Sequence, residues 1–169
     1  MNLKYSINQL ASHAATIQAL AREIPDEQAR WKPAIDSWSI LEVINHLYDE
    51  EREDFRVRLD YILHRPGQPW PPIDPAGWVT SREYNQRDLE ESVKNFLSER
   101  ERSLTWLPEL ASANWATTCP TPWGQITAGD MFAAWIAHDI LHLRQLVELH
   151  WAYNVHKVKP YTVQYAGDW

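Results

Sequence analysis

Two histidines four residues apart, His138 and His142, are the residues of this chain best suited to metal chemistry. They lie in a segment, residues 135–146, whose apolar residues have helical spacing. Residues four apart share one face of a helix, with Cβ atoms roughly 6 Å apart. Both imidazoles could therefore bind one metal ion, at nitrogen–metal distances of about 2.0–2.1 Å. His46, on the apolar face of a second helical segment, is the best candidate for a third ligand.

Three histidines from two helices would leave coordination positions open. That is typical of catalytic sites, because structural zinc sites are closed by four protein ligands. All-nitrogen ligation suits zinc, nickel, iron or manganese. With zinc, a water in the open position could have a pKa of roughly 7. From spacing alone an alternative stays equally open, in which these are core histidines held by hydrogen bonds.

Glu50, one turn after His46, is the candidate for proton transfer. It could accept a proton from water or a thiol, or orient an imidazole from behind. The alternative is a solvated carboxylate within the acidic run of residues 49–54.

Other polar residues near the pair have more ordinary interpretations. Asp139 points roughly 100° away from His138, which favours an outward salt bridge or an interhelix hydrogen bond. Arg144 and Gln145 are predicted to be structural, with contact to a substrate carboxylate as the alternative. Cys119 has no adjacent histidine or basic residue, so a nucleophilic role is disfavoured. Surface or helix-end roles are predicted for the remaining histidines: His13, His64, His150 and His156.

Four segments have helical periodicity and are separated by proline-containing connections. Ser39 with Glu42 fits a capping box at the start of the second segment, and Thr127 with Asp130 resembles a capping pair at the start of the fourth. On the fourth helix the predicted inward face includes Ala134 and Leu141 beside the two histidines. The predicted helices cover residues 3–24, 39–64, 82–107 and 127–151.

The sequence predicts one all-α domain over residues 1–169, a four-helix bundle. Residues 65–81 hold five prolines and have no helical period. A connection of that length lets the second and third helices run parallel, which a short hairpin would not. No alternating run of apolar residues is present, so no sheet is expected.

Charge and composition limit the partners. A formal net charge of −7 without a Lys/Arg cluster argues against nucleic acid. No run approaches the ~20 apolar residues needed to cross a bilayer. The N-terminus lacks a signal-peptide pattern, and one cysteine excludes an intrachain disulfide, so a cytoplasmic protein with a small-molecule substrate is predicted. The ten tryptophans are predicted mainly to hold loops onto the helices, with cavity lining as the alternative.

The sequence also resembles a known family. The segment from His138 to Leu146 is similar to the C-terminal signature of the DinB-like (DinB/YfiT) superfamily, and residues 38–47, which open with Trp-Ser and contain His46, resemble its first motif. Residues 123–127 and the closing residues 165–169 are similar to sequences common in that family.

The resemblance implies an up-down-down-up four-helix bundle, a divalent metal held by His46, His138 and His142, and a homodimer. Some members of the family are thiol S-transferases that use bacillithiol, mycothiol or glutathione, or thiol-dependent isomerases, and others are described as metal-dependent hydrolases. The leading hypothesis is therefore a metal-dependent enzyme that activates a thiol or water for S-transfer or hydrolysis, with zinc as the first choice of metal. The alternative is a non-catalytic stress protein that binds a metal or a small ligand.

Overall fold

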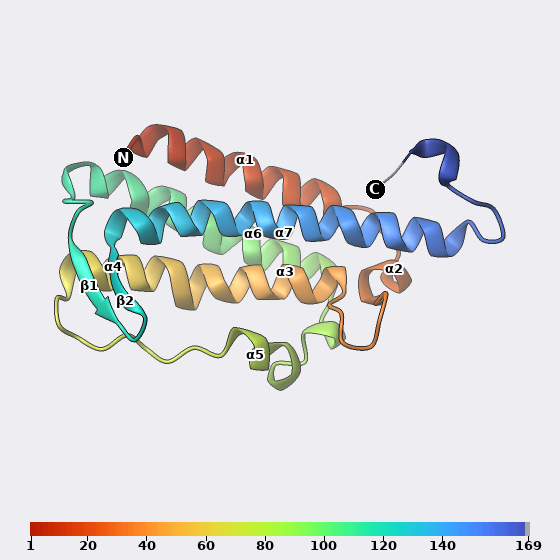
Figure 1. Ribbon diagram of the computed structural model, residues 1–169, viewed down its shortest axis with the longest axis horizontal. Coiled ribbons are helices and arrows are strands. Elements are labelled where there is room, and N and C mark those ends of the chain that lie inside the picture. The colour runs from red at the N-terminus through yellow and green to blue at the C-terminus, as the bar shows by residue number, and fades with distance from the viewer. Residues whose placement is uncertain (168–169) are drawn as a thin grey trace.

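The computed structural model describes residues 1–167 and places four long helical segments side by side (Figure 1). The first is α1, and the second consists of α3, the π-helix η1 and α4 in direct succession. The third is α6 and the fourth is α7. Their bounds are Leu3–Ala21 (α1), Ile40–Asp49 (α3), Glu50–Phe55 (η1), Arg56–His64 (α4), Leu89–Trp106 (α6) and Ala128–Lys157 (α7).

The topology of the bundle is up-down-down-up. In Figure 1 the chain runs from left to right along α1 and returns from right to left along α3 and α4. The crossover then leads back to the right, and α6 runs from right to left again. α3 and α6 therefore run parallel, and α7 runs with α1. The predicted four-helix bundle with a long crossover is confirmed.

The crossover is more ordered than the sequence indicated. It contains a short helix, α5 (Pro75–Ser81), that starts with proline at a first-turn position and is capped by Asp74. Proline is well tolerated there because the first helical N–H groups have no partner within the helix. A 3-10 turn, η2 (Tyr84–Gln86), follows it.

The chain also forms a small sheet, so the expectation of no sheet was wrong. β1 (Thr118–Thr121) and β2 (Gly124–Thr127) pair antiparallel, with Thr118 opposite Thr127 and Thr121 opposite Gly124. Four-residue strands are too short to show a clear alternation of apolar residues. The remaining short helices are α2 (Asp26–Arg30), η3 (Leu107–Ser112) and η4 (Gln164–Ala166).

Capping residues determine where the long helices begin. Ser39 with Glu42 and Thr127 with Asp130 both form complete capping boxes. The third helix starts at Leu89, later than predicted, because the side chain of Asp88 caps it. The first helix ends at Ala21 instead of residue 24, since Arg22 is extended. Of the closing residues 165–169, Asp168 and Trp169 lie outside the described part of the chain.

The inward face of α7 differs from the predicted one. Ala134 and Leu141 are exposed, and Leu141 keeps 55% of its surface accessible. Asp139 is instead fully buried at 1%. The centre of the buried face passes through Trp135, Asp139 and Leu146, which places His138 and His142 at its half-buried edge.

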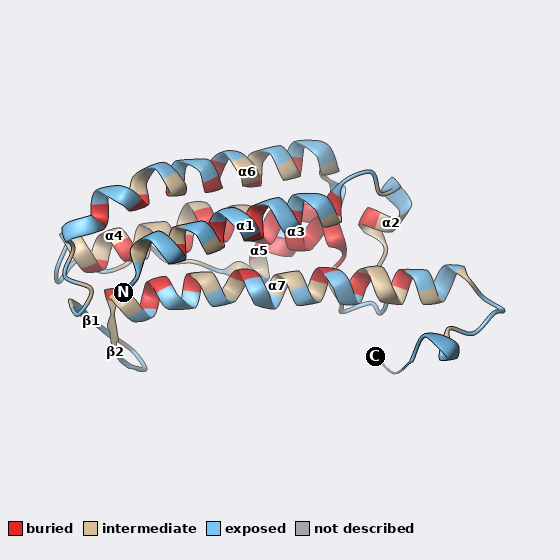
Figure 2. Cartoon of the chain, turned by 90° about the horizontal axis from the view of Figure 1, so that it is seen from above, coloured by how far each residue is buried: buried red, intermediate tan, exposed pale blue. Residues whose placement is uncertain are grey.

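Buried residues lie on the inner faces of the long helical segments (Figure 2). They form two main apolar clusters. One surrounds Phe132 and Trp135 near the hairpin, and the other surrounds Ile17 and Ile44. Between them, buried polar residues from α1, α3–η1, α6 and α7 form a polar layer. The candidate site is part of that layer.

None of the helices formed by residues 1–167 combines the length and the apolar character needed to cross a membrane. α7 exposes Ile140, Leu141 and Val147 at its surface. The homodimer stays a prediction.

Candidate metal centre

The structure brings the three predicted histidines together. His46 Nε2 lies 3.3 Å from His138 Nε2, which lies 3.1 Å from His142 Nε2. The three nitrogens all lie within 4.8 Å of one another. Two ligands at about 2.0–2.1 Å in a tetrahedral site are separated by roughly 3.3 Å. The spacing of the nitrogens therefore suits a zinc-sized cation.

The chemistry of these donors also suits a cation. His138 Nε2 faces two other Nε2 atoms, and a single ring hydrogen can satisfy only one such contact, whereas a cation accepts all three lone pairs. Burial, and then the charges of the other two imidazoles, lowers the pKa of His46 to about 2. Burial lowers the pKa of His138 to about 3, and it also lowers the pKa of His142. All three rings are neutral at pH 7, which is the form that binds metals.

Gln145 fixes the ring of His142. His142 Nδ1 donates to Gln145 Oε1 at 2.8 Å, so its hydrogen lies on Nδ1 and the Nε2 lone pair is free. The structural role predicted for Gln145 thus takes the form of a direct hydrogen bond to a candidate ligand. His46 Nδ1 is buried without a hydrogen-bond partner.

Two aromatic rings enclose the cluster. The Trp38 indole lies 4.9 Å from the His46 ring and parallel to the His142 ring at 6.4 Å, measured between centroids. Phe55 lies 4.9 Å from the His138 ring on the other side. Phe55 lies nine residues after His46 on the same helical segment, a spacing that gives the opposite face of a regular α-helix, so no signal for this contact was present in the sequence.

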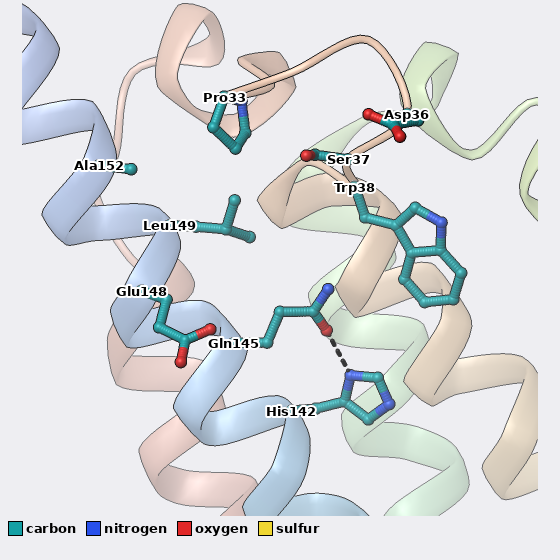
Figure 3. Close-up of a pocket in the computed structure, with 9 residues that line it drawn as sticks. All are labelled: Pro33, Asp36, Ser37, Trp38, His142, Gln145, Glu148, Leu149 and Ala152. Carbon is teal, nitrogen blue, oxygen red and sulfur yellow. Dashed lines mark hydrogen bonds between the residues drawn. The ribbon is translucent and has the colours of Figure 1, made fainter.

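An open groove of about 530 Å³ borders the cluster at His142 (Figure 3). It lies between α7 and the segment that leads into α3, and Trp38 and Gln145 form part of its wall. The groove gives a small molecule access from solvent to His142.

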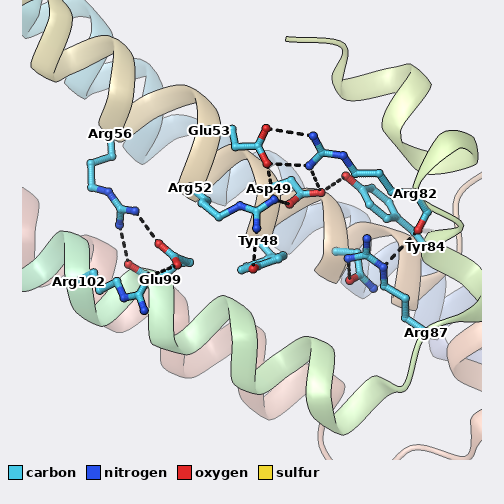
Figure 4. Close-up of polar contacts among 11 residues, drawn as sticks. Tyr48, Asp49, Arg52, Glu53, Arg56, Arg82, Tyr84, Arg87, Glu99 and Arg102 are labelled. Atoms are coloured by element: carbon cyan, nitrogen blue, oxygen red, sulfur yellow. Dashed lines mark hydrogen bonds and ion pairs between the residues drawn. The ribbon is translucent and has the colours of Figure 1, made fainter. Parts of the chain in front are cut away.

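The acidic run of residues 49–54 is not a solvated stretch, because only Arg52 and Glu53 in it are even partly exposed. Asp49 and Glu53 hold the crossover against the bundle (Figure 4). Arg82 contacts Asp49 Oδ2 at 2.7 Å and donates to both oxygens of Glu53, and the Tyr84 hydroxyl donates to Asp49 at 2.5 Å.

Glu50 differs from the rest of the run. It is 4% exposed, its Oε1 has no hydrogen-bond partner, and among the described residues it makes no ion pair. Burial, followed by the charge of Asp54, raises the pKa of Glu50 to about 8. Asp54 is itself paired with Arg58 at 2.6 Å. The interpretation of Glu50 as a solvated carboxylate is therefore wrong.

The helix is locally widened at Glu50, where the π-helix η1 begins. The backbone N–H of Glu50 reaches the carbonyls of both His46 and Leu47. Single π-helical turns occur often at functional sites. Nothing in the sequence indicated this change of pitch.

A second buried polar cluster adjoins the first, and the sequence analysis missed it. Arg100 donates to both oxygens of Glu51 at 2.9 Å and to both oxygens of Asp139 at 2.7 and 2.9 Å. His13 Nδ1 lies 3.3 Å from Asp139, and Trp135 Nε1 donates to Glu51 at 2.9 Å. Arg100 stands four residues after the buried Phe96 on α6, and that spacing was the signal.

This cluster corrects two interpretations. Asp139 makes an interhelix contact, as one alternative had it, but it does not point outward. His13 is buried, contrary to the predicted surface or helix-end role, because it packs against Asp139. His150 is half-buried, and its Nε2 lies 2.7 Å from the carbonyl oxygen of Leu20. His64 and His156 lie in the last turns of their helices, as predicted.

Comparison with known proteins agrees with the arrangement of the helices. The model of the DinB superfamily matches residues 9–146, a range that contains His46, Glu50, His138 and His142. The chain belongs to the DinB superfamily. No curated protein matches it.

Among solved structures, this DinB superfamily member is similar to YfiT from Bacillus subtilis. The two share 18% sequence identity with a TM-score of 0.77, and the alignment covers 87% of this chain and 85% of YfiT. YfiT is described as a probable metal-dependent hydrolase with an unusual four-helix bundle topology. At this identity the similarity shows the fold.

Proposed function

We propose that this DinB superfamily protein is a metal-dependent hydrolase in which His46, His138 and His142 hold a divalent cation and Glu50 transfers protons. The observation that carries the proposal is the convergence of three neutral Nε2 atoms at metal-ligand spacing. The description of the similar YfiT as a probable metal-dependent hydrolase supports it. Zinc is the first choice of metal, with nickel, iron and manganese as alternatives.

A divalent cation in an open three-histidine site supplies Lewis acidity and makes water acidic enough to lose a proton near neutral pH. The protein residues do the rest. Gln145 holds His142 in the tautomer that presents Nε2, and Trp38 and Phe55 limit the access of bulk water to the imidazoles. Glu50, with a pKa near 8, can take a proton from the attacking water and return it to the leaving group.

The first experiment measures the metal content of untagged protein by elemental mass spectrometry. Near-stoichiometric zinc, nickel, iron or manganese is expected in the natural protein, and little in a His138→Ala/His142→Ala variant whose helical circular dichroism is unchanged. Absence of metal after reconstitution with each ion would overturn the proposal and leave the histidines as core residues.

The second experiment measures hydrolysis of activated esters by the metal-loaded protein. Glu50→Gln should lower kcat by about 10²–10⁴-fold with the metal content unchanged. Glu101→Gln, which changes an exposed carboxylate on α6 in the same way, is the matched control. If the metal-loaded protein hydrolyses no ester, and Glu50→Gln leaves its metal content unchanged, the protein would be a carrier. Thioether formation only with an added low-molecular-weight thiol would reassign the site to S-transfer.

A further inference from the structure

The groove beside the histidines has an unusual charge distribution. Its charged lining residues are Asp36, from the segment before α3, and Glu148, from α7 (Figure 3). No lysine or arginine lines it. Asp36 is exposed and makes no ion pair with any residue of the described chain. Within the described part of the chain Glu148 pairs only with Arg144, at 3.3 Å, and both side chains are largely exposed, so this pair screens the carboxylate weakly.

Aromatic and apolar groups share the groove with these carboxylates. Trp38 lines the groove and lies parallel to the His142 ring, and Leu149 and Pro33 form further apolar surface. A tryptophan face attracts cations through its negative quadrupole, and nearby carboxylates strengthen that preference. Tryptophan combined with acidic side chains is suited to an ammonium group.

The groove would therefore favour opposite charges at different places. A divalent cation held by three neutral imidazoles has a net positive charge and favours the electron-rich oxygen of a carbonyl group. Asp36 and Glu148 favour a positive group elsewhere along the groove.

The geometry points to an ester or amide that bears an ammonium group as the substrate class. The carbonyl is placed at the histidines and the ammonium group at Trp38, Asp36 and Glu148. For an ester, the oxygen of water bonds to the carbonyl carbon, the bond from that carbon to the alkoxy oxygen breaks, and the alcohol leaves with a proton returned by Glu50. This inference rests on the proposed hydrolase for its chemistry, but the groove's selectivity for charge can be measured without turnover.

The kinetic test compares three 4-nitrophenyl esters of similar acyl length. They are the esters of 4-(trimethylammonio)butyrate, its neutral isostere 5,5-dimethylhexanoate, and glutarate. For the zinc-loaded protein, kcat/KM should be about tenfold higher for the cationic ester than for the isostere, and lowest for the anionic ester. In Asp36→Asn/Glu148→Gln the ratio of cationic to neutral ester should fall toward one. Glu101→Gln/Glu109→Gln removes two exposed carboxylates outside the groove and should keep the ratio.

A binding test separates this inference from the proposed function. The amides of the cationic and neutral acids are titrated into metal-free protein and followed by NMR. Tighter binding of the cationic amide that depends on Asp36 and Glu148 supports the inference, even if no ester is hydrolysed and the hydrolase proposal fails. Equal binding of the two amides, or a preference that survives Asp36→Asn/Glu148→Gln, overturns the inference, even if the esters are hydrolysed.

Discussion

Two polar clusters lie side by side in the interior of this bundle, and they are built in opposite ways. The histidine cluster includes His138, whereas the arginine cluster includes the next residue of α7, Asp139. Adjacent residues of one helix thus belong to different clusters. The difference distinguishes buried polar groups that stabilise the fold from buried polar groups that are arranged to bind a ligand.

The arginine cluster is closed. Arg100 has five N–H donors, and they reach Glu51, Asp139 and the Leu10 carbonyl. Arg100 is 1% exposed, and the charges of Glu51 and Asp139 raise its pKa against the effect of burial. These groups satisfy one another and need no ligand.

The histidine cluster is open. Three Nε2 lone pairs converge, and His46 Nδ1 has no hydrogen-bond partner among residues 1–167. Glu50 Oε1, one helical turn after His46, also has none there. Buried groups without partners cost roughly 1–3 kcal/mol each. These buried polar atoms lack partners although the neighbouring arginine cluster is fully hydrogen-bonded. A bound cation and a substrate would supply the missing partners.

The largest effect is expected from breaking the closed cluster. Arg100→Met should lower the free energy of unfolding by about 3–5 kcal/mol, because Glu51 and Asp139 would remain buried without their cation. Chemical denaturation of the metal-free protein measures this loss. His138→Ala, in the open cluster, should cost far less and should abolish metal binding.

A rescue variant tests the reason for that loss. In Arg100→Met/Glu51→Gln/Asp139→Asn the buried carboxylates are neutral, so the protein should be more stable than Arg100→Met alone. Equal stability of the single and triple variants would mean that the arginine acts through packing and not through charge.

A smaller effect is expected at the hydrogen bond that orients a candidate ligand. Gln145→Ala should weaken metal affinity about 10–100-fold, since the His142 ring loses the partner that fixes its tautomer. Competition with a chromogenic chelator measures the affinity. Gln125→Ala, at an exposed position of the hairpin, is the control and should bind metal normally. Unchanged affinity in Gln145→Ala would show that the tautomer is fixed without this contact.

The sequence predicted the open cluster better than the closed one. Histidines at four-residue spacing are rare enough to be noticed, and His46 interrupts an apolar stripe, so all three could be named before the fold was known. The order of helices followed from proline-containing connections and from two capping boxes. These are local signals, each contained within a few residues.

The closed cluster depends on tertiary contacts that no local pattern encodes. Arg100 is 49 residues from Glu51 and 39 from Asp139 along the chain. The sequence left Asp139 between an outward salt bridge and an interhelix hydrogen bond, because the only local information was its angle of roughly 100° to His138. The packing of α7 against α1 and α4 decides the inward face of α7, and it buries Asp139 while exposing Leu141.

The pH dependence of stability gives a last contrast, because the contributions of Glu50 and Asp139 should differ in sign. Burial raises the pKa of Glu50 from 4.5 to about 8 in the folded protein. Between these values the folded chain binds a proton that the unfolded chain has lost, so this contribution to stability falls as pH rises. Arg100 and His13 instead hold the pKa of Asp139 below its usual 3.8, so its contribution is lost only as pH falls below that value.

Comparing natural metal-free protein with Glu50→Gln isolates the first contribution. Burial also lowers the pKa of His46 and His138 from 6.5, which makes stability rise with pH up to that value in both proteins. The difference between the two free energies of unfolding removes this shared trend. That difference should shift steadily against the natural protein from about pH 5 to about pH 8. A constant difference would mean that the pKa of Glu50 is not raised by burial in the folded chain.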